Sequence, residues 1–486
     1  MTHLSSFYID GAWVAPIAST PFPVMNPATN TQIGEVQLGS PADVDKAVAA
    51  ASRAFKTFSK TSKAERLALL KRLHAVFAAR VEEMAQAITA EMGAPITMSR
   101  DAQADCGLGH IQCFIDALIE LPEQETLPNG DTLMRDPIGV CGLITPWNWP
   151  INQITQKVVP ALATGATCVL KPSEYTPLSA ALFAEFVHEA GYPAGVFNLV
   201  FGDGPNVGSA LSNHPDIAMM SFTGSTRAGV LVSKDAADTV KRVTLELGGK
   251  SPNLVFADCD LETRVAASVA ECFYNTGQSC NAPTRLLVER SCYDQALDIA
   301  ANAAAAQTVG DPSQEGDHIG PLFDQLQYDR VQAMIQIGID EGARVLSGGL
   351  GRPEGINQGW FVRPTIFADV TNEMRIAREE IFGPVLVIIP FDTEEEAIEV
   401  ANDSDFGLAA YVQTGSASRA VRITSQLRAG AVAINGHGTD YGSPFGGYKQ
   451  SGNGREGGVF GLEDYLELKV SPSISNLADM GCFTSD

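Results

Sequence analysis

The chain lacks the features that would place it in a membrane or on a nucleic acid. Its 486 residues contain no apolar run of about 18 residues or more, which excludes a membrane-spanning helix. Basic residues are few, with 33 Lys and Arg against 57 Asp and Glu and a formal net charge of −24. Because such a surface repels phosphate backbones and anionic lipid, we expect no nucleic-acid partner and no membrane partner.

Cysteine and histidine show no pattern of a disulfide framework or a metal site. The nine cysteines, from Cys106 to Cys482, are odd in number, irregularly spaced and without a C-x-x-C pair, which predicts free thiols. The seven histidines form neither an H-x-x-x-H pair nor a Cys/His cluster, so we expect no metal. The N-terminal segment, residues 1–8, lacks the basic and apolar regions of a signal peptide. Together these absences predict a cytoplasmic protein.

Local patterns predict an α/β chain of about three packed units. The first 120 residues contain a hairpin over 8–14, with Asp10-Gly11 at its turn, and helices over 41–58, 63–92 and 98–120. Ser40-Pro41-Ala-Asp43 is a typical helix start, with a capping serine and proline at the first helical position.

Short apolar strands then alternate with helices, which indicates parallel sheets with crossover helices. The first group of expected strands is 140–144, 168–170, 197–201 and 219–222, and the second is 253–256, 285–288, 385–389 and 431–434. The second group should form a separate α/β domain. The polar segment 121–136 and the alternating tail 465–470 are typical of an exposed sheet.

Cys280 is the residue that indicates chemistry most directly. Most free cysteines are buried structural residues, but Gly-Gln-Ser-Cys280-Asn-Ala is small and polar on both sides. A thiolate attacks electrophilic carbon, and a nearby carboxylate can take its proton or activate a water. Glu246, in Leu-Glu246-Leu-Gly-Gly-Lys, has apolar neighbours whose desolvation should raise its pKa. Asn148, in Pro-Trp-Asn148-Trp-Pro, offers an amide for an oxyanion, although it can equally turn the chain before proline.

Together these three segments resemble the aldehyde dehydrogenase superfamily, and the resemblance runs from the N-terminal hairpin to the tail. It implies an α/β fold with a Rossmann-like cofactor domain, an α/β catalytic domain and an arm of a β-hairpin and the C-terminal strand that pairs subunits. Carried onto this sequence, the NAD(P)-binding domain is 1–117 with 138–248, the catalytic domain is 249–450 and the arm is 118–137 with 451–486. The implied assembly is a homo-oligomer, a dimer or a tetramer.

The resemblance also implies the reaction. Cys280 would add to the aldehyde carbon, Asn148 would hold the resulting oxygen, and Glu246 would activate the water that releases the acid. The presence of Glu246 favours the non-acylating branch, which releases a free acid. Lys157 and Glu456 match the proton path of the family, although they can equally form a surface ion pair. Two other functions stay open: a catalytically silent homologue used for binding or structure, and a thiol esterase using the same cysteine.

The cofactor expected from the resemblance is NAD, with NADP possible. Gly224 and Ser225 follow an apolar strand and open a helix, as at a pyrophosphate site, but they lack the G-x-G-x-x-G pattern and also suit an ordinary helix cap. Phe382 would lie against the nicotinamide ring and Glu380 would hold its ribose, while Glu174 would meet the other ribose and repel the phosphate of NADP. The implied cofactor-binding residues are Thr145, Pro146, Trp147, Lys171, Ser173, Glu174, Gly204, Phe222, Thr223, Gly224, Ser225, Leu247, Glu380 and Phe382.

The expected substrate is a small-molecule aldehyde. Residues 281–285, Asn-Ala-Pro-Thr-Arg, resemble a bacterial branch that acts on ω-oxo acids and semialdehydes. The positions that match the substrate tunnel of the family are more polar than a plain aliphatic aldehyde requires; they are Trp149, Gln153, Gln156, His437, Asp440 and Tyr441.

Overall fold

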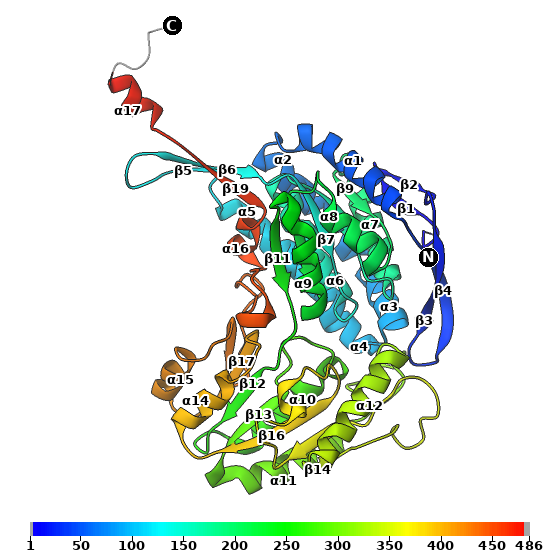
Figure 1. The fold of residues 1–486 in the computed structure, drawn as a ribbon, viewed down its shortest axis with the longest axis vertical. Coiled ribbons are helices and arrows are strands. Elements are labelled where there is room, and N and C mark those ends of the chain that lie inside the picture. Colours follow the sequence, from blue (N-terminus) through cyan, green and yellow to red (C-terminus); the bar gives the residue numbers. More distant parts are fainter. Residues whose placement is uncertain (1–2, 481–486) are drawn as a thin grey trace.

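Two seven-stranded sheets form the centres of two α/β units, and a small third sheet extends from the upper unit (Figure 1). The computed structural model describes residues 3–480. Cys482 and the last part of the expected arm, 481–486, lie outside the described residues, as do residues 1–2 of the N-terminal segment.

The sheet of the upper unit has the strand order β11-β10-β7-β8-β9-β1-β2. Its parallel strands are β7 (Val140–Ile144), β8 (Thr167–Lys171), β9 (Phe197–Leu199), β10 (Met219–Thr223) and β11 (Arg242–Glu246). The chain starts in the middle at β7, proceeds outward to β9, and then returns to β10 on the other side. The order therefore reverses between β7 and β10, and ligands of such sheets bind outside the carboxyl ends of the strands at this point.

The N-terminal hairpin extends this sheet with antiparallel strands. β1 (Phe7–Ile9) pairs with β9 and with β2 (Ala12–Val14), as the hairpin prediction requires. Asp10 and Gly11 have φ angles of 55° and 77°, the left-handed pair of a two-residue hairpin turn. A second hairpin, β3 (Thr20–Asn26) with β4 (Thr31–Leu38), forms a separate two-stranded sheet.

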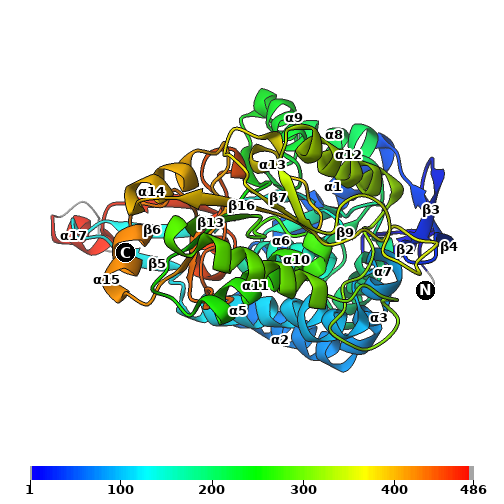
Figure 2. The same ribbon diagram turned by 90° about the horizontal axis from the view of Figure 1, so that it is seen from below.

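Helices cover both faces of the upper sheet (Figure 2). One face carries α2 (Lys63–Ala79), α3 (Val81–Met92), α5 (Asp105–Glu120), α6 (Pro150–Thr164) and α7 (Pro177–Glu189). The other carries α1 (Pro41–Phe58), α8 (Ser209–Asn213) and α9 (Thr226–Ala236). Short turns complete this unit: α4 (Ile96–Met98), η1 (Ser99–Ala104), η2 (Gly204–Gly208) and η3 (Ala237–Thr239). The predicted start of α1 is confirmed, because the Ser40 backbone N–H donates to Asp43 Oδ2 at 2.9 Å.

The lower unit has its own sheet, with the order β14-β15-β16-β13-β12-β17-β18. Its strands are β12 (Pro252–Val255), β13 (Arg285–Glu289), β14 (Arg344–Ser347), β15 (Thr365–Ala368), β16 (Val385–Phe391), β17 (Ala409–Gln413) and β18 (Ala431–Ile434). All pairs are parallel except β14 with β15. The four strands expected here are present, and the sequence reasoning missed β14, β15 and β17.

Alternate side chains of the lower sheet enter two separate cores. Leu286 and Val288 pack with α10 (Leu261–Phe273) and α11 (Tyr293–Ala306). Leu287 packs on the opposite face, with the helices that follow later in the chain. These are α12 (Gln325–Asp340), α13 (Arg375–Arg378), α14 (Glu394–Asn402) and α15 (Ala417–Thr424), and two short turns, η4 (Tyr274–Gly277) and η5 (Arg290–Cys292), complete the unit.

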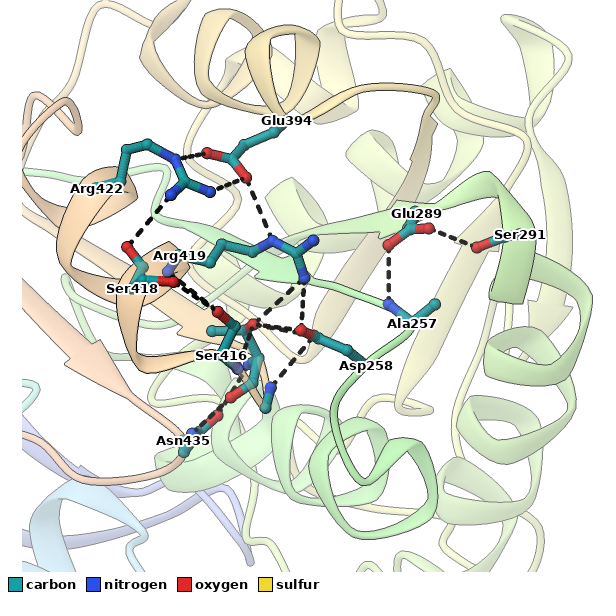
Figure 3. A network of polar contacts seen from close by, with 12 residues as sticks. Ala257, Asp258, Glu289, Ser291, Glu394, Ser416, Ser418, Arg419, Arg422 and Asn435 are labelled. Carbon is teal, nitrogen blue, oxygen red and sulfur yellow. Dashed lines mark hydrogen bonds and ion pairs between the residues drawn. The ribbon is translucent and has the colours of Figure 1, made fainter.

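An ion-pair network connects the helices α14 and α15 of the lower unit (Figure 3). Arg419 on α15 contacts Asp258 at 2.6 Å and Glu394 at 3.2 Å, and Glu394 also contacts Arg422 at 2.6 Å. Asp258 accepts a hydrogen bond from Thr414, whose backbone N–H donates to Asn435 Oδ1 at 3.0 Å. Single exposed ion pairs stabilise little, but this shared network ties two helices to Asn435. The loop that follows Asn435 therefore starts from a fixed position.

The arm is a three-stranded antiparallel sheet with the order β19-β6-β5. Its strands are β5 (Gln124–Thr126), β6 (Thr132–Pro137) and β19 (Leu466–Ser471), and the last turns are η6 (Lys449–Ser451), α16 (Gly458–Glu463) and α17 (Ile474–Asp479). The predicted exposed sheet is confirmed, because β6 and β19 pair along their whole length. On β19, an edge strand, Leu468 and Val470 are 64% and 55% exposed. Within residues 3–480, no helix has both the length and the apolarity that a membrane crossing requires.

Candidate functional site

The motif segments follow the carboxyl ends of the parallel strands in the upper sheet. β7 leads into Thr145–Asn148, β8 into Ser173 and Glu174, and β10 into Gly224. Because the strands are parallel, these ends lie along one edge of the sheet. A cavity of about 800 Å³ opens there, and residues of the lower unit, including Glu380, complete its wall.

Every residue expected to bind a dinucleotide lines this cavity. From the upper unit these are Thr145, Pro146, Trp147, Lys171, Ser173, Glu174, Gly204, Phe222, Thr223, Gly224, Ser225 and Leu247, and from the lower unit Glu380 and Phe382. The sequence reasoning missed Tyr175, Phe323, Gln327 and Arg330, which also line it. Phe323 stacks on Trp147 with ring centroids 3.6 Å apart. It lies in a loop of the lower unit without a glycine-rich or charged motif, so no local pattern marked it.

The middle of the cavity suits a pyrophosphate. Ser225 caps the eleven-residue helix α9, whose N-terminus favours anions. Thr145 and Thr223 each have a buried hydroxyl without a protein partner among the described residues, and both line the cavity. Unpartnered buried hydroxyls are rare, so these two fit a bound polar group. The residues present therefore fit a dinucleotide.

Two carboxylates, those of Glu174 and Glu380, line the cavity. Glu174 Oε2 is 3.2 Å from Lys171 Nζ. Glu380 accepts a hydrogen bond from the Gly249 N–H at 2.9 Å, and burial raises the pKa of its carboxyl to about 7. Phe382 has a φ angle of 60°, and Gln327 Nε2 donates to its carbonyl at 2.7 Å. The rings of Phe382 and Trp147 form an edge-to-face contact, with centroids 5.5 Å apart.

Cys280 lies on the wall of the same cavity, at the end of a strained turn. Asn275, Thr276 and Gly277 have φ angles of 52°, 57° and 68°, three left-handed residues in succession. A Cβ at Gly277 would overlap the Gly383 carbonyl, and a Cβ at Gly249 would overlap the carbonyl of Cys280. Close approach of the glycine backbone therefore brings the Cys280 segment against the end of the upper sheet.

Asn148 is held beside the Cys280 segment by its own amide and backbone. Its side chain is 4% exposed, and Nδ2 donates to the Gln278 carbonyl at 3.0 Å. Its carbonyl accepts from Asn275 Nδ2 at 3.0 Å and from Gln103 Nε2 at 3.1 Å. One N–H of the Asn148 amide stays available for a ligand oxygen, as an oxyanion site needs.

The surroundings of Cys280 favour its thiol over its thiolate. Burial raises its pKa to about 12, and the carboxylates of Glu380 and Glu246 add to this rise. A reaction at the Cys280 sulfur would therefore need a base that takes the proton of the thiol.

Comparison with known proteins agrees with this geometry. The model of the aldehyde dehydrogenase family matches residues 13–471. The chain belongs to the aldehyde dehydrogenase family. The fold and the family membership inferred from the motifs are thereby confirmed, and the protein is an oxidoreductase of this family.

Individual aldehyde dehydrogenases match over nearly their whole length. A 3-succinoylsemialdehyde-pyridine dehydrogenase from Pseudomonas sp. is 53% identical, over 97% of this chain and 98% of the relative. The structure of an aldehyde dehydrogenase from Bartonella henselae is 51% identical, with a TM-score of 0.95 over 96% of this chain and 98% of that one. A mutant of aldehyde dehydrogenase C from Pseudomonas syringae, in complex with NAD+ and octanal, is 50% identical, with a TM-score of 0.96 over 97% of both chains.

In this aldehyde dehydrogenase, Glu246 lies at the end of β11, and its carboxyl is buried. It is 3% exposed, and neither oxygen has a partner among the described residues. Burial raises the pKa of Glu246 well above its usual range; the charge of Glu456 adds to the rise, while Lys157 and Arg455 oppose it. An unpartnered carboxyl with a raised pKa is suited to exchange protons.

Lys157 and Glu456 form a buried ion pair beside Glu246. Lys157 Nζ is 2.5 Å from Glu456 Oε1 and 3.1 Å from Ser221 Oγ, and the side chain of Lys157 is fully buried. The alternative of a surface ion pair is therefore wrong. Within residues 3–480, no three His, Cys, Asp or Glu side chains are grouped to hold a metal ion.

Proposed function

We propose that this aldehyde dehydrogenase oxidises its aldehyde to the free acid, with NAD and through a covalent adduct on Cys280. The observation that carries the proposal is the position of Cys280. It lies on the wall of a cavity lined by the residues that we expect to bind a dinucleotide, within electrostatic reach of the unpartnered carboxyl of Glu246.

The proposed chemistry begins when Glu246 takes the proton of the Cys280 thiol. The Sγ–C bond forms as the carbonyl electrons move to oxygen, where the Asn148 amide and the Cys280 N–H donate to the oxyanion. The carbonyl bond then re-forms as the aldehyde C–H bond breaks, which leaves a thioester on Cys280. NAD, when bound, would supply the acceptor for this hydride. Glu246 then takes a proton from water, the water oxygen attacks the thioester carbon, and the C–S bond breaks to release the acid. The buried Lys157–Glu456 pair would pass protons between Glu246 and solvent.

The proposed substrates are aldehydes that carry a second polar group, as semialdehydes do. The Pseudomonas sp. relative is named for a semialdehyde, and segment 281–285 resembles enzymes of that kind.

We further propose that 118–137 with 451–486 form the subunit-pairing arm of a dimer or tetramer, with 1–117 and 138–248 as the cofactor domain and 249–450 as the catalytic domain. The exposed Leu468 and Val470 on the edge strand β19 support this pairing. The eight cysteines of the described part are free thiols, which fits a reducing compartment such as the cytoplasm.

The direct test is NADH formation with a panel of aldehydes, together with the amount of acid and the hydrolysis of a nitrophenyl ester. We expect one NADH and one acid for each aldehyde consumed. Ester hydrolysis without NADH would indicate a thiol esterase. Neither reaction would indicate a silent homologue, and in both cases the proposal would be wrong.

Replacing Asn148 by alanine should lower kcat by about 10²- to 10³-fold, because the oxyanion loses one donor. The affinity for NAD should stay the same. Steady-state kinetics and calorimetric NAD binding check this result, with Asn213→Ala on the surface of α8 as the matched control. If Asn148 only turns the chain, the variant would lose thermal stability while the remaining folded enzyme kept its kcat.

Replacing Glu174 by glutamine should shift cofactor preference toward NADP. Two like charges about 4 Å apart interact by about 4 kcal/mol at an effective dielectric of 20, and solvent reduces this penalty. We therefore expect wild type to prefer NAD, and Glu174→Gln to raise kcat/KM for NADP by about tenfold, since Lys171 would then face the phosphate alone. Glu262→Gln, exposed on α10, is the control. If wild type prefers NADP, and the ratio of kcat/KM for NADP to that for NAD is unchanged in the variant, Glu174 does not contact the ribose.

A further inference from the structure

Glu91, close to the end of α3, lies in the interior of the upper unit. Its side chain is 2% exposed, although glutamate is almost never fully buried without a partner. The helix α7 packs against α3 beside it (Figure 1). The chemistry proposed above gives this buried carboxyl no role, so its partners on α7 indicate what it does.

The carboxyl of Glu91 caps the N-terminus of α7. Its Oε2 accepts from the Leu178 N–H at 2.6 Å, and its Oε1 accepts from the Ser179 N–H at 3.0 Å. The first N–H groups of a helix have no partner within the helix, and the side chain just before the helix normally supplies one. Thr176 holds that position, but it makes no such bond, and its buried hydroxyl has no partner among the described residues. The cap of α7 therefore comes from another helix.

This cap needs two acceptors on one side chain. Burial raises the pKa of Glu91 to about 8, while the hydrogen bonds from Ser179 and Leu178 oppose the rise. Both oxygens of a carboxyl can accept in either protonation state, so the cap does not depend on the charge. A glutamine of the same size has one acceptor oxygen, and its NH2 group would face the second N–H.

The capped end of α7 is also the end of segment 171–176, which forms part of the cofactor cavity. The segment begins at the last residue of β8, where the Lys171 carbonyl accepts from the Thr145 N–H at 3.2 Å. Its residues that line the cavity are Lys171, Ser173, Glu174 and Tyr175. Because the segment is short, fixing both of its ends determines where these side chains lie.

Tyr175 connects the segment to the lower unit. Its ring contacts that of Phe323 edge to face, with centroids 5.0 Å apart, and Phe323 in turn stacks on Trp147. A displacement of the segment would therefore also disturb the part of the cavity wall that both units share.

We propose, resting on the NAD binding proposed above, that Glu91 is a positioning residue for the cofactor. By capping α7, it holds segment 171–176 in the conformation that places Glu174 at the ribose. Glu91 is not among the described residues that line the cavity, so it acts only through this segment. Without the cap, this conformation is one of several in the free enzyme. The apparent Kd for NAD then rises by the inverse of its population.

Glu91→Gln should weaken NAD binding by about tenfold, as a population of about one tenth requires. The ratio of kcat/KM for NADP to that for NAD should rise, because a displaced Glu174 repels the NADP phosphate less. This rise should be smaller than the one expected of Glu174→Gln. Ester hydrolysis without NAD should keep its wild-type rate, since it uses Cys280 but not segment 171–176. Calorimetry and steady-state kinetics are the measurements, and the cofactor ratio is independent of the amount of folded enzyme.

Matched variants separate this role from stability. Ile88→Val, at a fully buried position of α3, should lower Tm but keep the wild-type Kd and cofactor ratio. Glu83→Gln, the same replacement at an exposed position of α3, should also keep both. Glu91→Asp retains two acceptors on a shorter side chain, so its Kd should rise by a smaller factor. It provides the same test if the glutamine variant does not fold.

A double variant tests whether Glu91 acts through Glu174. In Glu91→Gln with Glu174→Gln, the loss of NAD binding free energy should be smaller than the sum of the two single losses. Losses that add in full would overturn the proposal. A lower Tm in both Glu91 variants, with wild-type Kd and cofactor ratio, would overturn it as well, because Glu91 would then serve stability alone. Absence of NAD binding in wild type would instead overturn the proposed cofactor site.

Discussion

Cys280→Ala should lower kcat for aldehyde oxidation by at least about 10⁴-fold and remove ester hydrolysis with it, because no covalent adduct can form. NAD should still bind with the wild-type affinity. Cys280 contributes only one position to a cavity of about 800 Å³, and the residues that suit the pyrophosphate and riboses belong to other segments. Steady-state NADH formation, ester hydrolysis and calorimetric NAD binding are the three measurements.

Cys259→Ala is the matched control for this experiment. Cys259 is a free, half-buried cysteine of the lower unit and does not line the cavity. We expect it to keep wild-type activity. Turnover retained in Cys280→Ala would mean that another cysteine reacts or that the reaction has no covalent step. Loss of NAD binding together with activity would mean that Cys280 supports the fold of the cavity.

The sequence predicted most of the framework because its strands are short apolar runs bounded by turns. β7, β8 and β10 each combine a short apolar run with a following motif, so both the strand and its carboxyl end were recognisable. β17, with the sequence Ala-Ala-Tyr-Val-Gln, is fully buried but begins with two alanines, and alanine favours strands weakly. It becomes a strand because β12 and β18 pair with it on both sides.

The site was predicted as far as it consists of local motifs. Cys280, Glu246 and Asn148 are marked by their neighbours, and the fold brings all three to the end of the upper sheet. Phe323 and Gln327 reach the cavity from the other unit, so only tertiary structure assigns them.

The burial of Lys157 likewise could not be read from the sequence. All positions of α6 except Asn152 are buried, so the helix has no solvent-facing side on which a lysine would lie. The sequence of this helix is amphipathic, which normally marks the polar side as exposed, so only the tertiary packing shows that this side is buried too.

Glu246→Gln should separate the two halves of the reaction. Glutamine keeps the size of the side chain, which packs against Gly446 and Gly454, but it cannot accept a proton. We expect steady-state kcat to fall by about 10²- to 10⁴-fold, because the thioester is no longer hydrolysed with base assistance. A burst of about one NADH per active site should remain if another base, or solvent, can deprotonate Cys280. Rapid-mixing measurements of NADH resolve the burst from the steady state.

The pH profile gives an independent test of the same role. A base must be ionised to act, and burial with the neighbouring charge of Glu456 raises the pKa of Glu246 well above its usual range. Wild-type kcat should therefore rise with pH along a limb above the ordinary range of a glutamate, near 4.3 in peptides. This limb should be absent in Glu246→Gln and present at reduced amplitude in Glu246→Asp, which keeps a shorter carboxylate. A variant with wild-type steady-state rates across the neutral range would exclude Glu246 as the base. Loss of the burst as well would place its action earlier, at the Cys280 thiol, because no thioester can form until that proton has left.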